Sequence, residues 1–276
     1  MSDPLSIAAS VVGITAAALH STRLLLEDLQ QLKDAPNTVK RLVEDVHSVD
    51  TALKLVQGVE DREWELLGAG LAELLKTTIS SCEKASDLFR TDLQRWTRHS
   101  EDGKLAWKDR AKVGFFKQGQ IKSMSEQLSN CRLTITSAVS IANLYISVRH
   151  SHVTEEIKKT ICTTQAEVKG AITTADKQLV VLENKMEELN LSSDDEAAGS
   201  REGKTETMRR LEEELKAVKV SRKLLNELMS KSQEKAVAKV AGNPTPSTTA
   251  TFGNQNSGFQ AGTINGGVSG ISFGGK

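Results

Sequence analysis

The spacing of apolar residues predicts helices over most of the chain. Between Pro36 and Arg149, apolar side chains recur every three or four residues, which places them on one face of a helix. Strand-like alternation of apolar and polar residues is absent from the sequence. We therefore predict an all-α bundle with about four or five helices before residue 150. One stripe consists of Val39, Leu42, Val43, Val46, Val49, Leu53 and Val56.

Pro, Gly and Asn residues indicate where these helices end. We expect breaks at Asp34–Asn37, near Gly58–Asp61 and at Ser100–Gly103, because these segments combine helix-breaking residues with polar ones. A further segment, Ser192–Lys204, is rich in Ser, Asp, Glu and Gly and is predicted to be a linker.

Beyond Arg149 the apolar stripe becomes narrow, as in a long helix or a coiled coil. The two segments on either side of the predicted linker could fold back as an antiparallel hairpin or extend the bundle. The first seam is Ile161, Thr164, Val168, Ala171, Ala175, Leu179, Leu182, Met186 and Leu189, and the second is Met208, Leu211, Leu215, Val218, Leu225 and Met229.

The N-terminal segment Pro4–Thr22 contains no charged residue and is apolar nearly all the way round, so we expect a helix buried on most sides. It approaches the roughly 20 residues that cross a bilayer, but its Ser, Thr, Gly and His residues make it a poor permanent span. It lacks the basic region and cleavage site of a secretory signal and is expected to remain on the mature protein. The candidate membrane-inserting residues are Leu5, Ile7, Val11, Val12, Gly13, Ile14 and Leu19.

The composition changes abruptly at Ala241. From there to the end the only charged residue is Lys276, and nine of the 19 glycines and three of the six phenylalanines lie in this tail. Uncharged Asn and Gln favour stacked amide ladders, and isolated Phe, Ile and Val residues can pack a dry sheet interface. Composition alone fits an amyloid-forming tail and a flexible, low-complexity end equally well.

Charge and aromatic residues point to a second candidate site. The 36 basic residues balance the 36 acidic ones, so any charged partner must be recognised by a local patch, and no nucleic-acid partner is expected. Basic residues alternate with Trp and Phe between Arg90 and Lys122, as in a lipid-headgroup site. The alternative is a solvated helical hairpin whose aromatic residues pack inward. The candidate headgroup residues are Arg95, Lys108, Arg110, Lys112 and Lys117.

Catalytic and metal sites find no support, and no cofactor is expected. His150 and His152 are two residues apart and so point to different faces of a helix, unlike a zinc-binding pair four apart. No Gly-x-Ser-x-Gly elbow is present. The cysteines, Cys82, Cys131 and Cys162, are interpreted as reduced core thiols of a cytosolic protein.

Two segments resemble a known family. The opening Asp3–Ile14 is similar to the start of fungal HeLo-like (HELL) domains, and Gly258–Gly262 resembles the centre of the pseudo-palindromic, RHIM-like amyloid motif of fungal cell-death signalling. The resemblance implies a HeLo-like bundle at 1–230, similar to the four-helix executor domain of necroptosis, and a disordered amyloid-forming tail at 241–276. Within the first domain it implies a core bundle at 1–150, with long helices over 151–240.

The resemblance also implies a function. It implies a membrane-targeting, pore-forming cell-death effector, cytoplasmic at rest and at the plasma membrane once activated. A NOD-like receptor with a matching motif would template amyloid self-assembly of the tail, and plasma membrane lipids would be the target. The sequence has no phosphate-binding loop and no repeat array, as expected for an executor rather than a sensor. The implied motif residues are Asn256, Gly258, Phe259, Gln260, Ala261, Gly262, Thr263, Ile264, Asn265, Gly266, Val268 and Ile271.

A second hypothesis is a non-lytic helical adaptor. It would oligomerise through the coiled-coil seams and recruit partners by the tail without touching lipid. Any turnover of a substrate would instead indicate an enzyme, which is the least favoured class.

Overall fold

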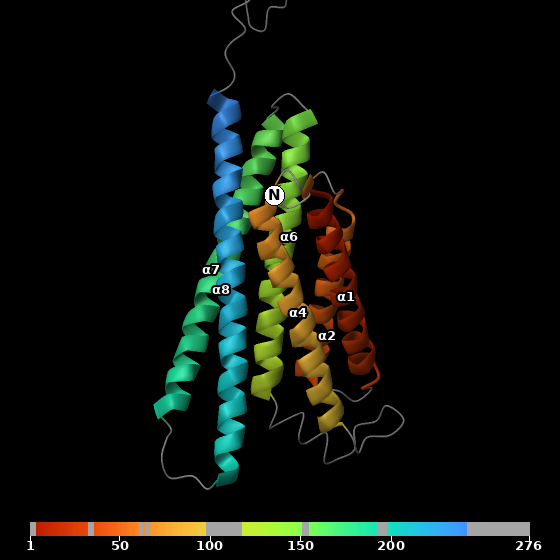
Figure 1. Ribbon diagram of the computed structural model, residues 1–276, viewed down its shortest axis with the longest axis vertical. Helices are drawn as coiled ribbons and strands as arrows, with labels where there is room; N and C mark the ends of the chain where they lie inside the picture. Colours follow the sequence, from red (N-terminus) through yellow and green to blue (C-terminus); the bar gives the residue numbers. More distant parts are fainter. Residues whose placement is uncertain are drawn as a thin grey trace, which may run out of the picture. The chain divides into compact units, whose positions relative to one another are not determined.

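The computed structural model in Figure 1 contains six long helices and no strand within the residues it describes. This confirms the predicted all-α fold. The helices are α1 (Pro4–Gln30), α2 (Asn37–Gln57), α4 (Ala69–Trp96), α6 (Gln118–His150), α7 (Glu155–Leu191) and α8 (Ala198–Ala241). Backbone is described for 4–32, 36–60, 63–64, 67–97, 118–150, 155–191 and 198–241, and side chains for 11–32, 36–60, 63–64, 67–97, 119–147, 156–191 and 204–233.

The chain divides into two compact units, residues 1–234 and 235–276. The tail residues 242–276, which include all twelve residues of the predicted amyloid motif, lie outside the described residues. The predicted domain organisation and the motif therefore stay predictions.

Four helices, α1, α2, α4 and α6, form a bundle before residue 150 (Figure 1). Helix α1 packs on α2 and α4, α6 packs on α2 and α4, and α7 packs on α6. The predicted stripe of α2 is confirmed, since Leu42, Val46 and Leu53 are fully buried and only Val43 is partly exposed. Helical spacing therefore identified the correct core face.

The predicted breaks agree with the described helix ends where the structure describes them. Helix α1 ends at Gln30 and α2 begins at Asn37, and α2 ends at Gln57, directly before Gly58. Gly68 precedes α4 with a φ of 91°, a conformation that favours glycine. The expected break at Ser100–Gly103 lies outside the described residues.

The linker prediction was partly wrong. Helix α8 begins at Ala198, so residues 198–204 are helical, and only 192–197 lie outside the described residues. Ala198, Arg201, Glu202 and Lys204 are strong helix formers, and they outweigh the local Gly and Ser residues.

Helices α7 and α8 run antiparallel. Contacts between them advance along α8 as they retreat along α7, from Glu183–Lys219 to Asp176–Arg222 and Gln165–Ser232. Their seams meet in a small cluster of four buried residues, Ala175, Leu179, Leu182 and Val218. The N-terminal half of α7 and the C-terminal half of α8 also pack into the main core. The residues concerned are Val168 and Ala171 of α7 and Leu224, Leu225 and Leu228 of α8. The sequence left open whether α7 and α8 form an antiparallel hairpin or extend the bundle. In the structure they do both.

Candidate functional site

Helix α1 has one buried face and one exposed face, which corrects the expectation that it is buried on most sides. Within residues 11–22, Thr15 is fully buried, whereas Val12 is 39% exposed, and four further residues of this segment are exposed. The reason is the position of α1, which packs on α2 and α4 and leaves its outer side uncovered. The buried apolar residues of α1 are Val11, Ala18, Leu19, Leu25 and Leu29, and the other exposed residues of segment 11–22 are Gly13, Ala16, Ala17 and His20.

The candidate membrane-inserting residues therefore do not form one surface. Val11 and Leu19 are buried, and Ile14 is half-buried against the core. Val12 and Gly13 are exposed, and nothing lies near the position of an added Cβ on Gly13. Leu5 and Ile7 belong to α1, but their side chains lie outside the described part. In that part of the chain, no helix combines the length and apolar character needed to cross a membrane.

Thr15 satisfies its hydroxyl within its own helix. Its Oγ1 donates a hydrogen bond of 2.7 Å to the backbone oxygen of Val11. Thr22, seven residues or two helical turns further along and also fully buried, has no hydrogen-bond partner for its Oγ1 among the described groups. The Thr15 hydroxyl therefore needs no partner from another helix, whereas the Thr22 hydroxyl is buried without one.

An ion-pair cluster joins the second half of α1 to α2. The Asp50 carboxylate accepts a hydrogen bond from Nε of Arg23 at 3.0 Å and lies 2.5 Å from Nζ of Lys54. Burial works to raise the pKa of Asp50, but the bonds and charges of Lys54 and Arg23 outweigh it and lower the pKa below its usual range. This cluster holds α1 by charge just after its uncharged segment ends.

A second polar contact joins α1 to α4. Nε of Arg90 and Nε2 of Gln94 both donate to the Asp28 carboxylate, at 2.9 and 3.0 Å. Arg90 begins the basic segment that the sequence singled out as a lipid site. In the structure its guanidinium instead pairs with the partly buried Asp28 and so joins α4 to α1.

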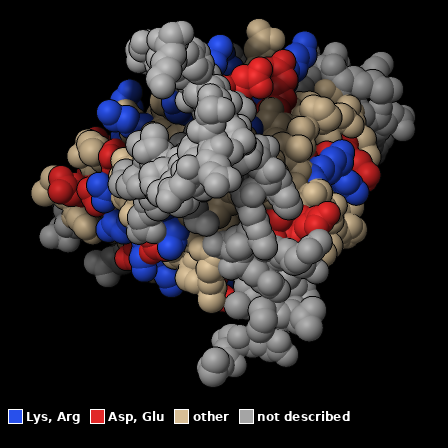
Figure 2. All heavy atoms as spheres, turned by 90° about the horizontal axis from the view of Figure 1, so that it is seen from above, with Lys and Arg blue, Asp and Glu red and all other residues tan. Residues whose placement is uncertain are grey.

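The candidate headgroup residues are not brought together within the described part. Arg95 is exposed and lies 3.8 Å from the Asp92 carboxylate, and Lys108, Arg110, Lys112 and Lys117 lie outside the described residues. Trp96 is buried, edge-on to Phe89 with ring centroids 5.6 Å apart, which agrees with inward packing of this aromatic residue. On the face in Figure 2, basic and acidic side chains lie next to one another.

Helix α8 is fastened to α4 by charge. The Arg210 guanidinium forms an ion pair with the buried Asp92, and its Nε donates to Glu206 at 2.7 Å. Hydrogen bonds from Arg209 and Arg210 lower the pKa of Glu206 to about 2. The partners Asp92 and Arg210 are 118 residues apart, so sequence spacing offered no signal for this contact.

A buried carboxyl group joins α8 to α6 and α7. Glu214 is 9% exposed and accepts hydrogen bonds from Ser123 Oγ at 2.9 Å and Gln178 Nε2 at 3.1 Å. Burial raises the pKa of Glu214, although both hydrogen bonds work against the rise. Glu214 lies at seam spacing, three residues after Leu211 and four before Val218, and this position in the sequence was an overlooked signal.

Two weaker contacts continue along α8. The Tyr145 hydroxyl donates to the backbone oxygen of Lys231 at 3.3 Å, and Gln165 Nε2 donates to Ser232 Oγ at the same distance. Helix α8 therefore contacts α4, α6 and α7 through polar groups along its described length.

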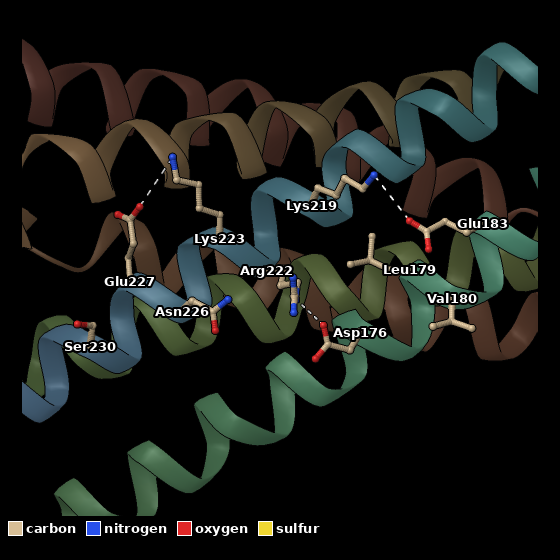
Figure 3. A pocket seen from close by; sticks show the side chains of 10 residues that line it. All are labelled: Asp176, Leu179, Val180, Glu183, Lys219, Arg222, Lys223, Asn226, Glu227 and Ser230. Atoms are coloured by element: carbon tan, nitrogen blue, oxygen red, sulfur yellow. Dashed lines mark ion pairs between the residues drawn. The ribbon is translucent and has the colours of Figure 1, made fainter.

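A groove runs between α7 and α8 (Figure 3). It has a volume of about 730 Å³, with Leu179 and Val180 on its α7 wall. Two ion pairs bridge it, Asp176–Arg222 at 2.5 Å and Glu183–Lys219 at 3.7 Å, and the other charged pair drawn in Figure 3, Lys223–Glu227, lies within α8. In the described part of the chain, no cluster of three or more His, Cys, Asp or Glu side chains is arranged to hold a metal ion.

The cysteine prediction held for two residues and was wrong for the third. Cys82 and Cys131 are buried and free, whereas Cys162 is free but exposed, because it lies on the outer side of α7. A hydrogen bond with Cys131, together with burial, raises the pKa of the Cys82 thiol well above its usual range. This pair is therefore an unreactive part of the core.

Comparison with known proteins gives one family. The model of the family described as pigment biosynthesis cluster protein PigL, N-terminal, matches residues 2–216. No curated protein and no solved structure matches the chain.

Proposed function

We propose that this chain, which belongs to the PigL N-terminal family, is a membrane-targeting cell-death effector that disrupts the bilayer after its tail receives an amyloid signal. In this proposal the helical domain is HeLo-like and the tail is the RHIM-like motif. A NOD-like receptor with a matching motif would template the tail. The protein would be cytoplasmic at rest and would move to the plasma membrane on activation, without enzymatic activity.

The observation that carries the proposal is the construction of α1. Its first nineteen residues, Pro4–Thr22, carry no charge, although charged residues make up 26% of the chain. Val12, Gly13, Ala16 and Ala17 are exposed although nothing polar in their side chains favours water. An uncovered, uncharged face on a helix at the edge of a bundle is a surface that lipid could cover.

The contacts that hold α1 suggest how it would be released. Its charged contacts, Arg23–Asp50 and Asp28–Arg90, lie after the uncharged segment. Arg23 and Arg90 are partly exposed, which weakens both pairs, and the buried Asp50 keeps Lys54 as a partner when Arg23 moves away. Assembly of tails would hold many copies together, and their combined membrane affinity would offset the marginal hydrophobicity of each α1.

A charge on the exposed face of α1 tests the proposal. Val12→Lys leaves the bundle intact because Val12 faces outward, but a lysine at a helix centre costs about 2.5–3.5 kcal/mol on insertion. Dye release from anionic liposomes, triggered with preformed fibrils of residues 241–276, is expected to fall at least tenfold. Leu88→Lys, at a similarly exposed apolar position on α4, is the matched control and keeps full release.

Equal release by the Val12→Lys and Leu88→Lys proteins would overturn the role of α1. A Gln260→Ala protein that still grows fibrils on the preformed seeds would separately remove the role of the tail.

The adaptor is the second candidate. In its favour, no described helix can cross a membrane, and a tail that assembles needs no lipid to recruit partners. Fibrils that seed the full-length protein while no dye escapes would select this function.

A further inference from the structure

Large apolar side chains are exposed on the outer face of α7. Of the six such side chains in the described part of the protein, three lie in the C-terminal half of this helix. They are Val180 at 56%, Val181 at 42% and Leu191 at 83% exposed. Val181 and Leu191 point away from the seam that packs on α8, and Val180 lies at the rim of the groove between the two helices, so none of the three is buried within the hairpin.

The hairpin behind this face has little core of its own. Its separate cluster contains four buried residues and two partly buried ones, Leu211 and Leu215. Two helices packed on so few residues are marginal, whereas a four-helix arrangement buries both sides of a central pair. A further pair of helices on the outer face would complete such a layer.

The charges on the outer face change sign at the valines. Lys169 and Lys177 lie on the N-terminal side of Val180, and Glu187 and Glu188 on the C-terminal side, all exposed and on the same stripe of the helix. A second α7 laid antiparallel places the basic half of each helix against the acidic half of the other. A parallel arrangement would instead oppose like charges.

The groove beside this face also carries charges of both signs. Its α8 wall carries Lys219, Arg222 and Lys223, which pair within the same copy with Glu183, Asp176 and Glu227, and Val180 lies on the opposite wall (Figure 3). The acidic end of a second α7 would lie beside these three basic side chains. Because the surface carries both signs of charge around an apolar centre, it suits a copy of itself better than an anionic membrane.

We propose that the outer face of α7, with the adjoining groove, is a self-association surface that joins two copies of this chain in an antiparallel, two-fold arrangement centred near Val180. In this arrangement residue 177 of each copy lies level with residue 183 of the other, which brings Lys177 within about one helical turn of Glu187 of the other copy. The residues of the surface all precede the tail in the sequence, and the proposed dimer needs neither amyloid assembly nor the proposed membrane role.

Sedimentation velocity of the full-length protein at micromolar concentration tests the surface, since it resolves a discrete dimer from larger tail-driven assemblies. The double variant Val180→Glu, Val181→Glu is expected to weaken dimerisation at least tenfold. Both positions are exposed, so the helical circular dichroism spectrum should not change. Leu55→Glu and Leu88→Glu, at exposed apolar positions on α2 and α4, are the controls and keep the dimer. A monomeric wild-type protein, or a dimer that survives the double variant, overturns the proposal.

A cross-link tests the orientation. With Cys162 changed to Ser, a Val180→Cys protein should form a disulfide-linked dimer under mild oxidation, because the two positions meet at the axis. Cys82 and Cys131 are buried and should not react. The wild-type Cys162 lies far from the axis and should stay unlinked. A parallel pair would bring both position 180 and Cys162 next to their counterparts, so efficient linkage of the wild-type protein through Cys162 would overturn the antiparallel arrangement, and absence of linkage through position 180 would overturn the surface itself.

Charge reversal gives an independent check. Lys177→Glu and Glu187→Lys should each weaken the dimer several-fold, and the protein carrying both changes should recover part of the loss, because positions 177 and 187 of the two copies then again carry opposite charges. If the double change is as weak as the single ones, these two charges do not meet across the interface.

Discussion

Helix α1 and the N-terminal part of α8, residues 204–217, both pack on the bundle, but they are held there by different interactions. The described part of α1 after Ala18 buries Leu19, Leu25 and Leu29, and its ion pairs are additions to an apolar contact. In α8 the only buried residue between Lys204 and Ala217 is Glu214, and Arg210 provides the other main contact.

The difference shows that helical spacing alone does not determine how firmly a helix is held. Burial of apolar area is insensitive to salt and pH, whereas ion pairs and a buried carboxyl group respond to both. The N-terminal part of α8 is therefore expected to open locally under conditions in which α1 stays docked.

The largest effect is expected in α1. Leu25→Ala removes a fully buried side chain and leaves a cavity, so the free energy of unfolding in urea should fall by about 3 kcal/mol. Leu211→Ala, at a half-buried position on α8, serves as the comparison and should cost less than about 1.5 kcal/mol. Equal losses at the two positions would contradict the contrast between these helices.

A smaller, local effect is expected at the α4–α8 ion pair. Asp92→Asn keeps the shape of the side chain but removes the charge that pairs with Arg210, and should cost about 1–2 kcal/mol. Amide hydrogen exchange should become faster in residues 204–217 and stay unchanged in α1. Raising the salt concentration of the wild-type protein should have the same local effect, and uniform acceleration in both helices would refute the local role.

The smallest effect has the opposite sign. Because the pKa of Glu214 is raised above 4.5 in the folded protein, its contribution to stability is complete below that pH and is lost as the pH rises through the folded value. At pH 7 the buried carboxylate is thus a cost, and Glu214→Gln should raise the free energy of unfolding by about 1 kcal/mol.

The pH profile checks the cause of that gain. The difference between wild type and the Gln protein should shrink as the pH is lowered toward 4.5. A difference that does not change with pH would mean that packing, and not protonation, is responsible.

The sequence predicted what depends on local spacing. The stripe of α2, the breaks after α1 and α2, and the seams of α7 and α8 all follow from 3.6-residue periodicity and helix-breaking residues. Arg222 interrupts the second seam, and the structure turns it toward the surface, where it pairs with Asp176.

What the sequence did not predict depends on the position of each helix in the bundle. An apolar helix such as α1 is buried all round only if other helices surround it, and here its outer side remains open. Cys162 is exposed for the same reason on α7. The burial of Glu214 and the pairing of Arg210 with Asp92 need three-dimensional neighbours that are distant in sequence.

The internal hydrogen bond of Thr15 lowers the cost of moving this polar residue of α1 out of the protein interior. A hydroxyl transferred from water to hydrocarbon normally loses its partners, but this one carries its acceptor, the oxygen of Val11, within the same helix. Its transfer free energy therefore depends little on whether protein or acyl chains surround it. Beyond Thr22 the charges of Arg23 and Asp28 make transfer from water or protein to hydrocarbon costly. The cost of transfer is therefore lower for the first part of the helix than for the second.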